Sequence, residues 1–353
     1  MTEKVLEVKN LVVSFRSAQG TVQAVRDLSF DLYKGETLAL VGESGAGKSV
    51  TGRAIMGLLA ANTEYLNGEI LFHGRDLMKL KERDFSEIRG CRIAMVFQDP
   101  FSSLDPVMRI GTQLTEAILA GQKDRPRSER MSKQEAGEKA RQLLQRVGIE
   151  EAEKCFRQYP FELSGGMRQR VVIAIALSQD PEILICDEPT TALDVTIQAQ
   201  ILELIKELQS EQAFSVLFIT HDLGVVADLA DRVAVLYAGR LCEIGTAEEI
   251  FYQPEHPYTW ALLRAVPDPD GKGELKAIPG QPPDMLHPPA GDAFALRNPD
   301  ALPQDFQEQP PLFQLSETHF AASWRLAPGV VSAPKPEVLR ERTEKHRSEE
   351  GAE

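Results

Sequence analysis

Apolar and polar positions alternate with two different periods along the chain, and the periods separate strands from helices. Leu6–Phe15 and Val22–Leu32 alternate in the way of half-buried strands, and we expect them to be antiparallel strands that cover the edge of a larger sheet. The short apolar runs Thr37–Val41, Ile183–Cys186 and Val216–Thr220 are typical of strands buried on both faces. These runs alternate with periodic helical stretches, which predicts an α/β domain with a largely parallel sheet.

Other local signals add detail to this domain. Ala238-Gly239 lies between two apolar stretches and predicts a hairpin-like pair of strands. Thr246-Ala-Glu-Glu249 matches a capping box and predicts the start of a short helix. From about residue 99 to 175 the pattern changes to helices joined by polar linkers, which indicates a helical subdomain.

The composition changes near Phe251 and marks a boundary. Of the 22 prolines, 16 lie from Pro254 onward and six lie before it. Residues 254–330 are rich in Pro and Gly and have no long apolar period, so we expect a loop-rich extension rather than a second catalytic domain. Residues 335–353 interleave five basic and six acidic residues with little apolar content, and residues 331–353 are expected to form a disordered tail. The main domain then covers residues 1–253.

Charge and hydropathy exclude several classes of protein. The net charge of −14 argues against broad electrostatic binding to nucleic acid or anionic lipid. The N-terminus lacks the apolar core of a secretory signal, and no apolar run approaches the roughly 20 residues that span a bilayer. The four cysteines lack paired metal spacing and suit a reducing compartment. We therefore expect a cytoplasmic protein that reaches a membrane only through a protein partner.

A phosphate-binding loop is predicted between a buried strand and a helix. Residues 42–49 read Gly-Glu-Ser-Gly-Ala-Gly-Lys-Ser and fit the pattern G-x-x-x-x-G-K-[ST]. The glycines let backbone N–H groups turn toward a β-phosphate, and the following helix N-terminus favours negative charge. Lys48 would reach the β- and γ-phosphate oxygens, and Ser49 would offer its hydroxyl to Mg²⁺. A plain glycine-rich turn before a helix is the structural alternative.

Two adjacent carboxylates end the strand Ile183–Cys186. One side chain of such a pair can face a metal ion while the other points toward a γ-phosphate. We assign Asp187 to Mg²⁺ and Glu188 to the attacking water. Without the phosphate loop, a solvated carboxylate pair at a strand end would be the better interpretation.

A second anion-binding helix start follows Leu163. Ser164, Gly165 and Gly166 directly precede an apolar helix that runs through Ile175. One phosphate site needs only one such loop, so the second is predicted to serve a nucleotide held by another subunit. With Leu163-Ser-Gly-Gly-Met167 the chain resembles the ABC ATPases, whose signature is LSGGQ, over about residues 5 to 250.

The resemblance implies the remaining roles. Gln98 is similar to the Q-loop glutamine, Asp194 to the D-loop aspartate, His221 to the switch histidine that contacts the γ-phosphate, and Phe15 to the aromatic residue that stacks on adenine. The full ATP-binding set is then Phe15, Gly42, Glu43, Ser44, Gly45, Ala46, Gly47, Lys48, Ser49 and Val50; the signature residues are Ser164, Gly165, Gly166 and Gln169; the catalytic residues are Glu188, His221 and Gln98; and the Mg²⁺ ligands are Ser49, Gln98 and Asp187. Val50 departs from the threonine that is frequent in the family.

Several phrases resemble one branch, the ATP-binding subunits of oligopeptide and dipeptide permeases. They are residues 97–106 (FQDPFSSLDP), 159–164 (YPFELS), 256–259 (HPYT) and 278–283 (IPGQPP). We expect a structural role for the 256–259 phrase. Many members of the branch carry four cysteines in this extension with the appearance of an iron–sulfur site. The matching positions here are Asp292, Asn298, Asp305 and Ser323, so no cluster is expected.

The resemblance implies an ATPase that energises oligopeptide import with ATP and Mg²⁺. The expected partners are a second and different ATPase subunit, two transmembrane permease subunits and an external peptide-binding protein, with the chain peripheral on the cytoplasmic face of the membrane. A dipeptide, nickel or oligosaccharide importer stays open as an alternative. A non-transport ABC ATPase is disfavoured, because no heptad array separates Lys48 from Ser164 and the acidic charge does not suit nucleic acid.

Overall fold

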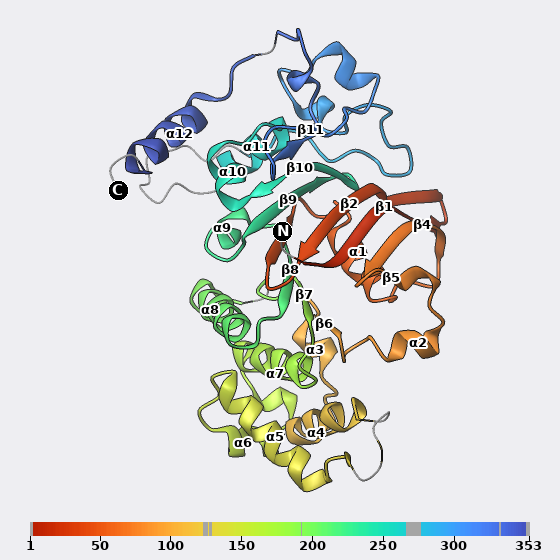
Figure 1. Ribbon diagram of the computed structural model, residues 1–353, viewed down its shortest axis with the longest axis vertical. Coiled ribbons are helices and arrows are strands. Elements are labelled where there is room, and N and C mark those ends of the chain that lie inside the picture. The colour runs from red at the N-terminus through yellow and green to blue at the C-terminus, as the bar shows by residue number, and fades with distance from the viewer. Residues whose placement is uncertain are drawn as a thin grey trace. The chain divides into compact units, whose positions relative to one another are not determined.

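The computed structural model of the 353-residue chain describes residues 3–122, 126, 129–191, 193–265, 277–331 and 333–350, with the backbone alone for 345–350. The chain divides into two compact units (Figure 1). The first unit contains residues 1–3, 33–36 and 79–218, and the second contains 4–32, 37–78 and 219–353. Each unit is described by itself.

An antiparallel sheet forms one part of the second unit, with strand order β2-β1-β4-β5 (Figure 1). Its strands are β1 (Lys4–Ser17), β2 (Gly20–Tyr33), β4 (Thr63–Phe72) and β5 (Arg75–Asp76). Strands β1 and β4 pair antiparallel, with Leu6 opposite Phe72 and Val8 opposite Ile70. The alternating N-terminal stretches therefore form strands, as their period predicted.

The second unit also holds a mixed group of strands. Strand β3 (Thr37–Val41) pairs parallel with β9 (Arg232–Tyr237), and β9 pairs antiparallel with β10 (Arg240–Thr246), which continues to β12 (Phe320–Ala321) and β11 (Phe313–Gln314). All five residues of β3 are buried. Ala238 and Gly239 both adopt positive φ between β9 and β10, which suits the tight hairpin turn predicted there.

Helices complete the second unit. They are α1 (Lys48–Ile55), α9 (Leu223–Val226), α10 (Ala247–Tyr252), α11 (Pro257–Ala265) and α12 (Glu337–Glu350), with 3₁₀ turns at Ala295–Arg297, Pro303–Phe306 and Trp324–Leu326. The capping box at the start of α10 is present, because the Thr246 side chain accepts from Glu249 N–H and the Glu249 side chain accepts from Thr246 N–H. One apolar core joins strands β3 and β9 to α10 and α11 and to Phe294 of the extension.

The first unit combines short strands with most of the helices. Strands β6 (Ile93–Val96) and β7 (Ile183–Asp187) pair parallel, and β8 (Ser215–Thr220) follows in the order β8-β7-β6. Its helices are α2 (Glu82–Ser86), α3 (Pro100–Ser103), α4 (Ile110–Ala120), α5 (Lys133–Arg146), α6 (Ala152–Arg157), α7 (Gly165–Leu177) and α8 (Val195–Gln212). A 3₁₀ turn lies at Pro160–Glu162, and another, Leu77–Lys79, contains the boundary between residues 78 and 79 at which the chain passes from the second unit to the first. Helices α3 to α7 cover the stretch where a helical subdomain is expected.

The tail differs from the expected disorder. Residues Glu337–Glu350 form α12, and Leu339 of this helix is buried in the core with Ile250 and Phe251. The Thr343 hydroxyl also donates hydrogen bonds to the Leu339 carbonyl and, across to α10, to the Tyr252 carbonyl. Leu339, the Thr343 hydroxyl and the Arg342 guanidinium, which lies over the Phe251 and Tyr252 rings, thus attach a segment whose composition alone predicted no structure. Across the described ranges, no helix combines the length and the apolar character needed to cross a bilayer.

Candidate functional site

The phosphate loop connects β3 to α1 in the second unit, where backbone crowding requires glycine at two of its three glycine positions. A Cβ atom on Gly42 would lie 2.0 Å from the Leu236 carbonyl oxygen, and one on Gly47 would lie 2.6 Å from the Ala24 carbonyl oxygen. Gly47 is also the N-cap of α1 with φ 94, a conformation that disfavours residues with a Cβ. The helix therefore begins at Lys48 with its N–H groups at the loop.

Lys48 lies over this loop with its ammonium group directed back at it. The side chain is buried, and Nζ donates to the carbonyl oxygens of Gly42 at 2.7 Å and Glu43 at 3.0 Å. Thr51 is fully buried and its hydroxyl donates to the Gly47 carbonyl, so Thr51 is unsuited to supply the phosphate hydrogen bond that the valine side chain at position 50 cannot make. Ser44 and Gly45 are exposed, and Glu43, Ser49 and Val50 are half-buried.

Two residues of the C-terminal extension contact the loop at Glu43. The Tyr258 hydroxyl accepts from Glu43 N–H at 2.8 Å, and the Arg297 guanidinium pairs with the Glu43 carboxylate. Neither residue was singled out from the sequence as a loop contact. The His-Pro-Tyr-Thr phrase was the one available signal for Tyr258, and no local pattern marks Arg297, which lies 254 positions from its partner.

The two carboxylates expected to act on Mg²⁺ and water end strand β7 of the first unit. Asp187 is buried, whereas Glu188 is half-buried and has a φ of 48. A non-glycine residue at positive φ stores backbone strain, which is frequent at functional sites. The Gln98 side-chain amide donates to Glu188 Oε2 at 3.0 Å, and the Thr191 hydroxyl donates to the same oxygen at 3.0 Å. The structure thus brings the predicted Gln98 and Glu188 together.

The signature loop begins α7 in the same unit. Ser164 is exposed as the N-cap, and its hydroxyl accepts from Met167 N–H at 3.3 Å. A Cβ on Gly166 would lie 2.7 Å from Ile197 Cγ2 of α8, so this position has room only for glycine. Asp194, the predicted D-loop residue, is exposed and caps α8 by accepting from Ile197 N–H. Ala192 of that loop lies outside the described residues.

Gln169 requires a correction. Its side chain is fully buried, and neither of its polar atoms has a hydrogen-bond partner among the residues that the structure describes. A buried side chain cannot contact a nucleotide held by another subunit, so this part of the predicted signature contact is wrong. The reason is its place on α7, where it faces the interior together with Val172 and Ile173.

Two further predicted residues belong to the second unit, as the phosphate loop does. His221 follows the end of β8 and is exposed, just before Asp222, which caps α9. Phe15 lies on β1 opposite Thr63 of β4 and is half-buried, so part of its ring faces solvent. An exposed histidine and a half-exposed ring are both accessible to a nucleotide.

Two of the extension positions at which the family resemblance implied cysteine, Asp292 and Asp305, accept hydrogen bonds from the backbone of the extension. Asp292 accepts from Phe294 N–H at 2.9 Å, and Asp305 accepts from Leu302 N–H at 2.6 Å. Asp292 and Asp305 are both buried, and burial raises the pKa of Asp305. Phe294 packs against Tyr237 and Tyr258, at 5.5 and 5.2 Å between ring centroids. Hydrogen-bonded carboxylates and aromatic packing therefore stabilise the extension.

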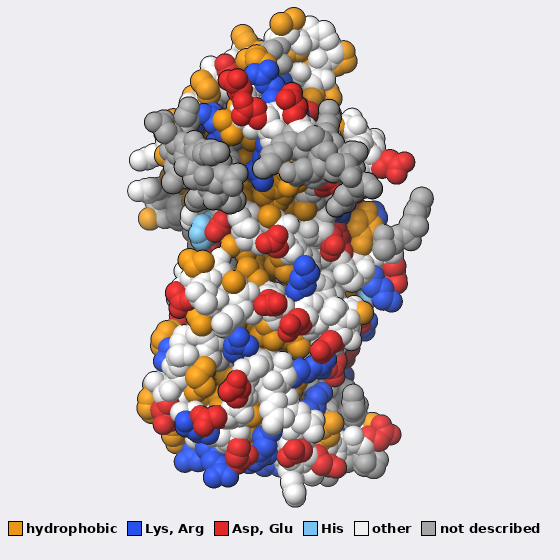
Figure 2. All heavy atoms as spheres, turned by 90° about the vertical axis from the view of Figure 1, so that its left-hand side faces the viewer, with side chains coloured by type: hydrophobic (Ala, Val, Ile, Leu, Met, Phe, Trp, Pro, Cys, Tyr) orange, Lys and Arg blue, Asp and Glu red, His pale blue; other side chains and the backbone are white. Residues whose placement is uncertain are grey.

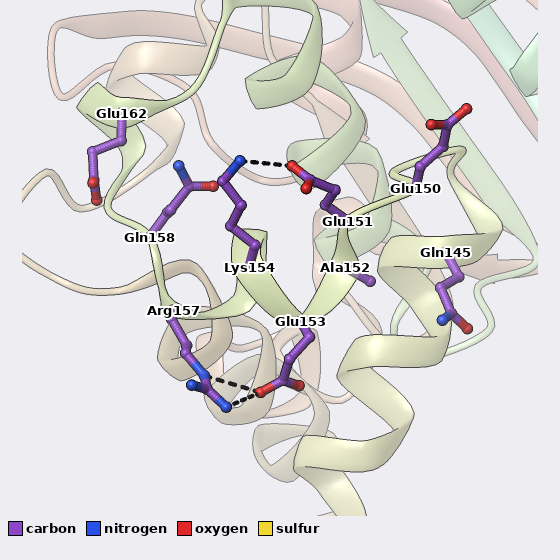
Figure 3. A pocket seen from close by; sticks show the side chains of 9 residues that line it. All are labelled: Gln145, Glu150, Glu151, Ala152, Glu153, Lys154, Arg157, Gln158 and Glu162. Atoms are coloured by element: carbon purple, nitrogen blue, oxygen red, sulfur yellow. Dashed lines mark hydrogen bonds and ion pairs between the residues drawn. The ribbon is translucent and has the colours of Figure 1, made fainter.

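A hollow of about 780 Å³ lies on α5, α6 and the segments beside them (Figure 3). Four of its six charged side chains form two pairs, Arg157 with Glu153 at 2.5 Å and Lys154 with Glu151 at 2.7 Å. The nine residues that line it include none of those predicted to bind ATP. We assign no ligand to this hollow.

The face in Figure 2 has acidic and basic side chains intermingled. Among the described residues of this face, acidic side chains interrupt the basic ones, which does not favour contact with a phosphate backbone. It agrees with the acidic net charge of the whole chain.

Comparisons with known proteins give two family matches. Residues 25–191 match the family described as "ABC transporter", and residues 242–304 match "Oligopeptide/dipeptide transporter, C-terminal region". The dipeptide transport ATP-binding protein DppD of Lactococcus lactis subsp. cremoris is 58% identical over 94% of this chain and 93% of its own length. The oligopeptide transport ATP-binding protein OppD of Bacillus subtilis is 53% identical over 97% of this chain and 94% of its own length.

Solved structures give a matching fold. The ATP-binding cassette MJ0796, solved as a dimer in a post-hydrolysis state bound to ADP and Pi, is similar with a TM-score of 0.60 and 27% sequence identity. The similarity covers 69% of this chain and 98% of that one. A second cassette, cbiO1 of Clostridium perfringens, is similar with a TM-score of 0.58 over 70% of this chain.

Proposed function

The chain belongs to the ABC transporter ATP-binding proteins of the oligopeptide and dipeptide branch, and from this premise we propose that it hydrolyses ATP to drive oligopeptide import through separate membrane subunits. The observation that best supports ATPase activity is the geometry at residues 42–49. A helix N-terminus follows two sterically required glycines, and a buried lysine is directed at the loop. This arrangement is a preformed site for an anion.

In this proposal the phosphate loop binds the triphosphate. Backbone N–H groups in the first turn of α1 bind the phosphates, and Lys48 transfers its hydrogen bonds from the loop carbonyls to the β- and γ-phosphate oxygens. Phe15 stacks on the adenine through its accessible ring face. His221 contacts the γ-phosphate.

Glu188 orients the attacking water. Gln98 holds the Glu188 carboxylate by a hydrogen bond and also serves as a Mg²⁺ ligand in this proposal. A carboxylate is suited to this work, since phosphoryl transfer depends mainly on positioning and charge stabilisation. The strained backbone at Glu188 and the hydrogen bonds from Gln98 and Thr191 restrict the directions in which the carboxylate can point.

The residues available for Mg²⁺ fit its chemistry. Ser49, Asp187 and Gln98 supply a hydroxyl, a carboxylate and an amide oxygen, and Mg²⁺ prefers oxygen ligands with one or two carboxylates beside substrate phosphates and water. Such a site needs no group of three acidic or histidine side chains, and none occurs among the residues that the structure describes. When bound, the ion neutralises charge on the phosphates.

The signature loop contributes to the ATP of a second ATPase subunit. The exposed Ser164 and the N-terminus of α7 form a second anion site, with Gly165 and Gly166 allowing close approach. Asp194 lies at the start of α8, whose Ile197 packs against Gly166. We propose that two such subunits close over two ATP molecules, as a population shift toward the closed state.

The remaining parts of the proposal concern cargo, partners and location. The branch includes proteins named for oligopeptide and for dipeptide transport, and we assign oligopeptides first, with dipeptides as the alternative. The assembly contains a related but different ATPase, two permease subunits and an external binding protein, on the cytoplasmic face of the membrane. Residues 1–253 act as the ATPase domain, and residues 254–330 form the extension typical of the branch.

The test compares wild type with Glu188→Gln. The variant keeps the side-chain shape but loses the charge that polarises water, so we expect hydrolysis to fall by at least about 100-fold while ATP binding persists. Light scattering should then detect an ATP-dependent dimer with the partner ATPase. Glu203→Gln, exposed on α8, is the matched control. Normal hydrolysis by Glu188→Gln would show that Glu188 has no catalytic role.

A further inference from the structure

Glu43, the second residue of the phosphate loop, is held at three points. Its carbonyl oxygen accepts from Lys48 Nζ at 3.0 Å, and its N–H donates to the Tyr258 hydroxyl at 2.8 Å. Its carboxylate pairs with both Nη atoms of Arg297, at 2.5 Å to Oε2 and 3.1 Å to Oε1. The C-terminal extension therefore holds the N–H and the carboxylate of Glu43, whereas the loop itself holds its carbonyl, through Lys48 Nζ and through Ala46 N–H at 3.2 Å.

Arg297 is itself rigidly placed. Its side chain is 4% exposed, its Nε donates to the Pro279 carbonyl at 2.7 Å, and its Nη1 donates to the Tyr237 hydroxyl at 3.0 Å. The Tyr237 and Tyr258 rings pack 4.5 Å apart between centroids, and both contact Phe294. A guanidinium fixed by carbonyl, phenol and ring contacts has little freedom, so its bidentate pair also fixes Glu43.

The charge of Glu43 gives this contact a chemical consequence. A carboxylate in a loop that binds a triphosphate would repel the ligand, and the repulsion is strong where burial weakens screening by solvent. The Glu43 side chain is 26% exposed, so solvent only partly screens it. The positive charge of Arg297 neutralises the carboxylate directly.

We propose that Arg297 is a positioning residue for ATP binding: it holds and neutralises Glu43, so that the C-terminal extension sets the ATP affinity of the phosphate loop in its own chain. The inference rests on the proposed ATP site at residues 42–49. If the Arg297–Glu43 pair served only to stabilise the fold, loss of Arg297 would destabilise the fold, and removing the charge of Glu43 as well would not restore ATP affinity.

The experiment titrates the full chain with a fluorescent ATP analogue in the presence of Mg²⁺. Arg297→Ala should bind the analogue about tenfold more weakly, the order expected when a partly buried charge loses its partner. Arg297→Ala combined with Glu43→Gln should recover most of that affinity, and Arg297→Lys should recover part of it because lysine keeps the charge but not the bidentate geometry. Arg264→Ala, also in the extension, is the control.

Each result distinguishes this inference from the proposed function. If wild type does not bind the analogue, the proposed ATP site fails and the inference fails with it. If wild type binds and Arg297→Ala binds equally well, only the role of Arg297 is overturned. Melting curves without nucleotide identify unfolded variants. Equal weakening in Arg297→Ala and in the double variant, with both folded, would overturn charge neutralisation.

Discussion

The Gln98 side-chain amide donates a hydrogen bond of 3.0 Å to the carboxylate of Glu188, although the two residues lie 90 positions apart in the chain. Gln98 follows strand β6 and Glu188 follows strand β7, and these strands pair parallel with Val96 opposite Cys186. The carboxyl ends of parallel neighbours meet at one edge of a sheet. The contact is therefore a direct consequence of the strand pairing.

Removing this contact should impair hydrolysis more than folding. We expect Gln98→Ala to lower the ATP turnover number by roughly 10- to 100-fold, because the carboxylate loses a donor that orients it. Gln98 is exposed, so the melting temperature should change little. Steady-state phosphate release and a thermal melt measure both effects. Thr191→Ala removes a second donor to the same carboxylate and provides the comparison. Wild-type turnover in Gln98→Ala would contradict this role.

Gly166→Ala should destabilise the start of α7 even though alanine favours helices. The added Cβ would lie 2.7 Å from Ile197 Cγ2, whereas a Cβ on Gly165 would lie 3.4 Å from Leu193, an ordinary contact. We expect a loss of about 1–2 kcal/mol of unfolding free energy for Gly166→Ala and a much smaller change for Gly165→Ala. Chemical denaturation measures both. The double variant Gly166→Ala with Ile197→Ala should recover the unfolding free energy that Gly166→Ala loses. If it does not, the contact with Ile197 is not the cause of the destabilisation.

Local patterns in the sequence predicted the parts of the site that are local in the chain. The phosphate loop, the hairpin at Ala238-Gly239 and the Thr246 capping box each depend on a few adjacent residues, and the expected elements are present. The alternation in the N-terminal stretches likewise predicted strands β1 and β2. Motifs of this kind are readable because the residue types and the backbone requirement occur together.

Contacts between distant segments could not be predicted in this way. The pair of Arg297 with Glu43 spans 254 positions, and neither residue carries a periodic signal. Gln169 was misplaced because α7 is apolar on several sides, so its sequence does not mark the buried face. Helix α12 was missed because its composition is mostly charged while its attachment depends on few residues, chiefly Leu339.

Leu339→Ala should release α12 from the second unit. The side chain is buried, and its truncation removes apolar contact at the one well-buried position of the described part of this helix. We expect a local loss of roughly 2 kcal/mol, seen as about 30-fold faster amide exchange in α12 with little change elsewhere. Val338→Ala, at an exposed neighbour, is the matched control. Equal exchange in the two variants would contradict a docking role for Leu339.

Asp305 should make the stability of the extension depend on pH. Burial raises the pKa of Asp305, and the charge of Asp292 raises it further. The hydrogen bond from Leu302 N–H lowers the pKa, but the net shift is upward. The folded chain therefore binds this proton more readily than the unfolded chain does. Stability from the protonated form is fully present below the pKa of an unfolded aspartate and is lost as the pH rises through the higher pKa of the folded state.

Asp305→Asn tests this sign directly. The asparagine oxygen can still accept from Leu302 N–H, but the side chain carries no charge to desolvate or to repel Asp292. We expect the variant to be more stable than wild type near pH 7.5 by on the order of 0.5–1 kcal/mol, with the difference shrinking as the pH falls toward about 4. Denaturant unfolding at several pH values measures it, with Asp300→Asn at an exposed neighbour as control. A difference that stays constant with pH would show that hydrogen bonding, and not the charge of Asp305, sets its effect on stability.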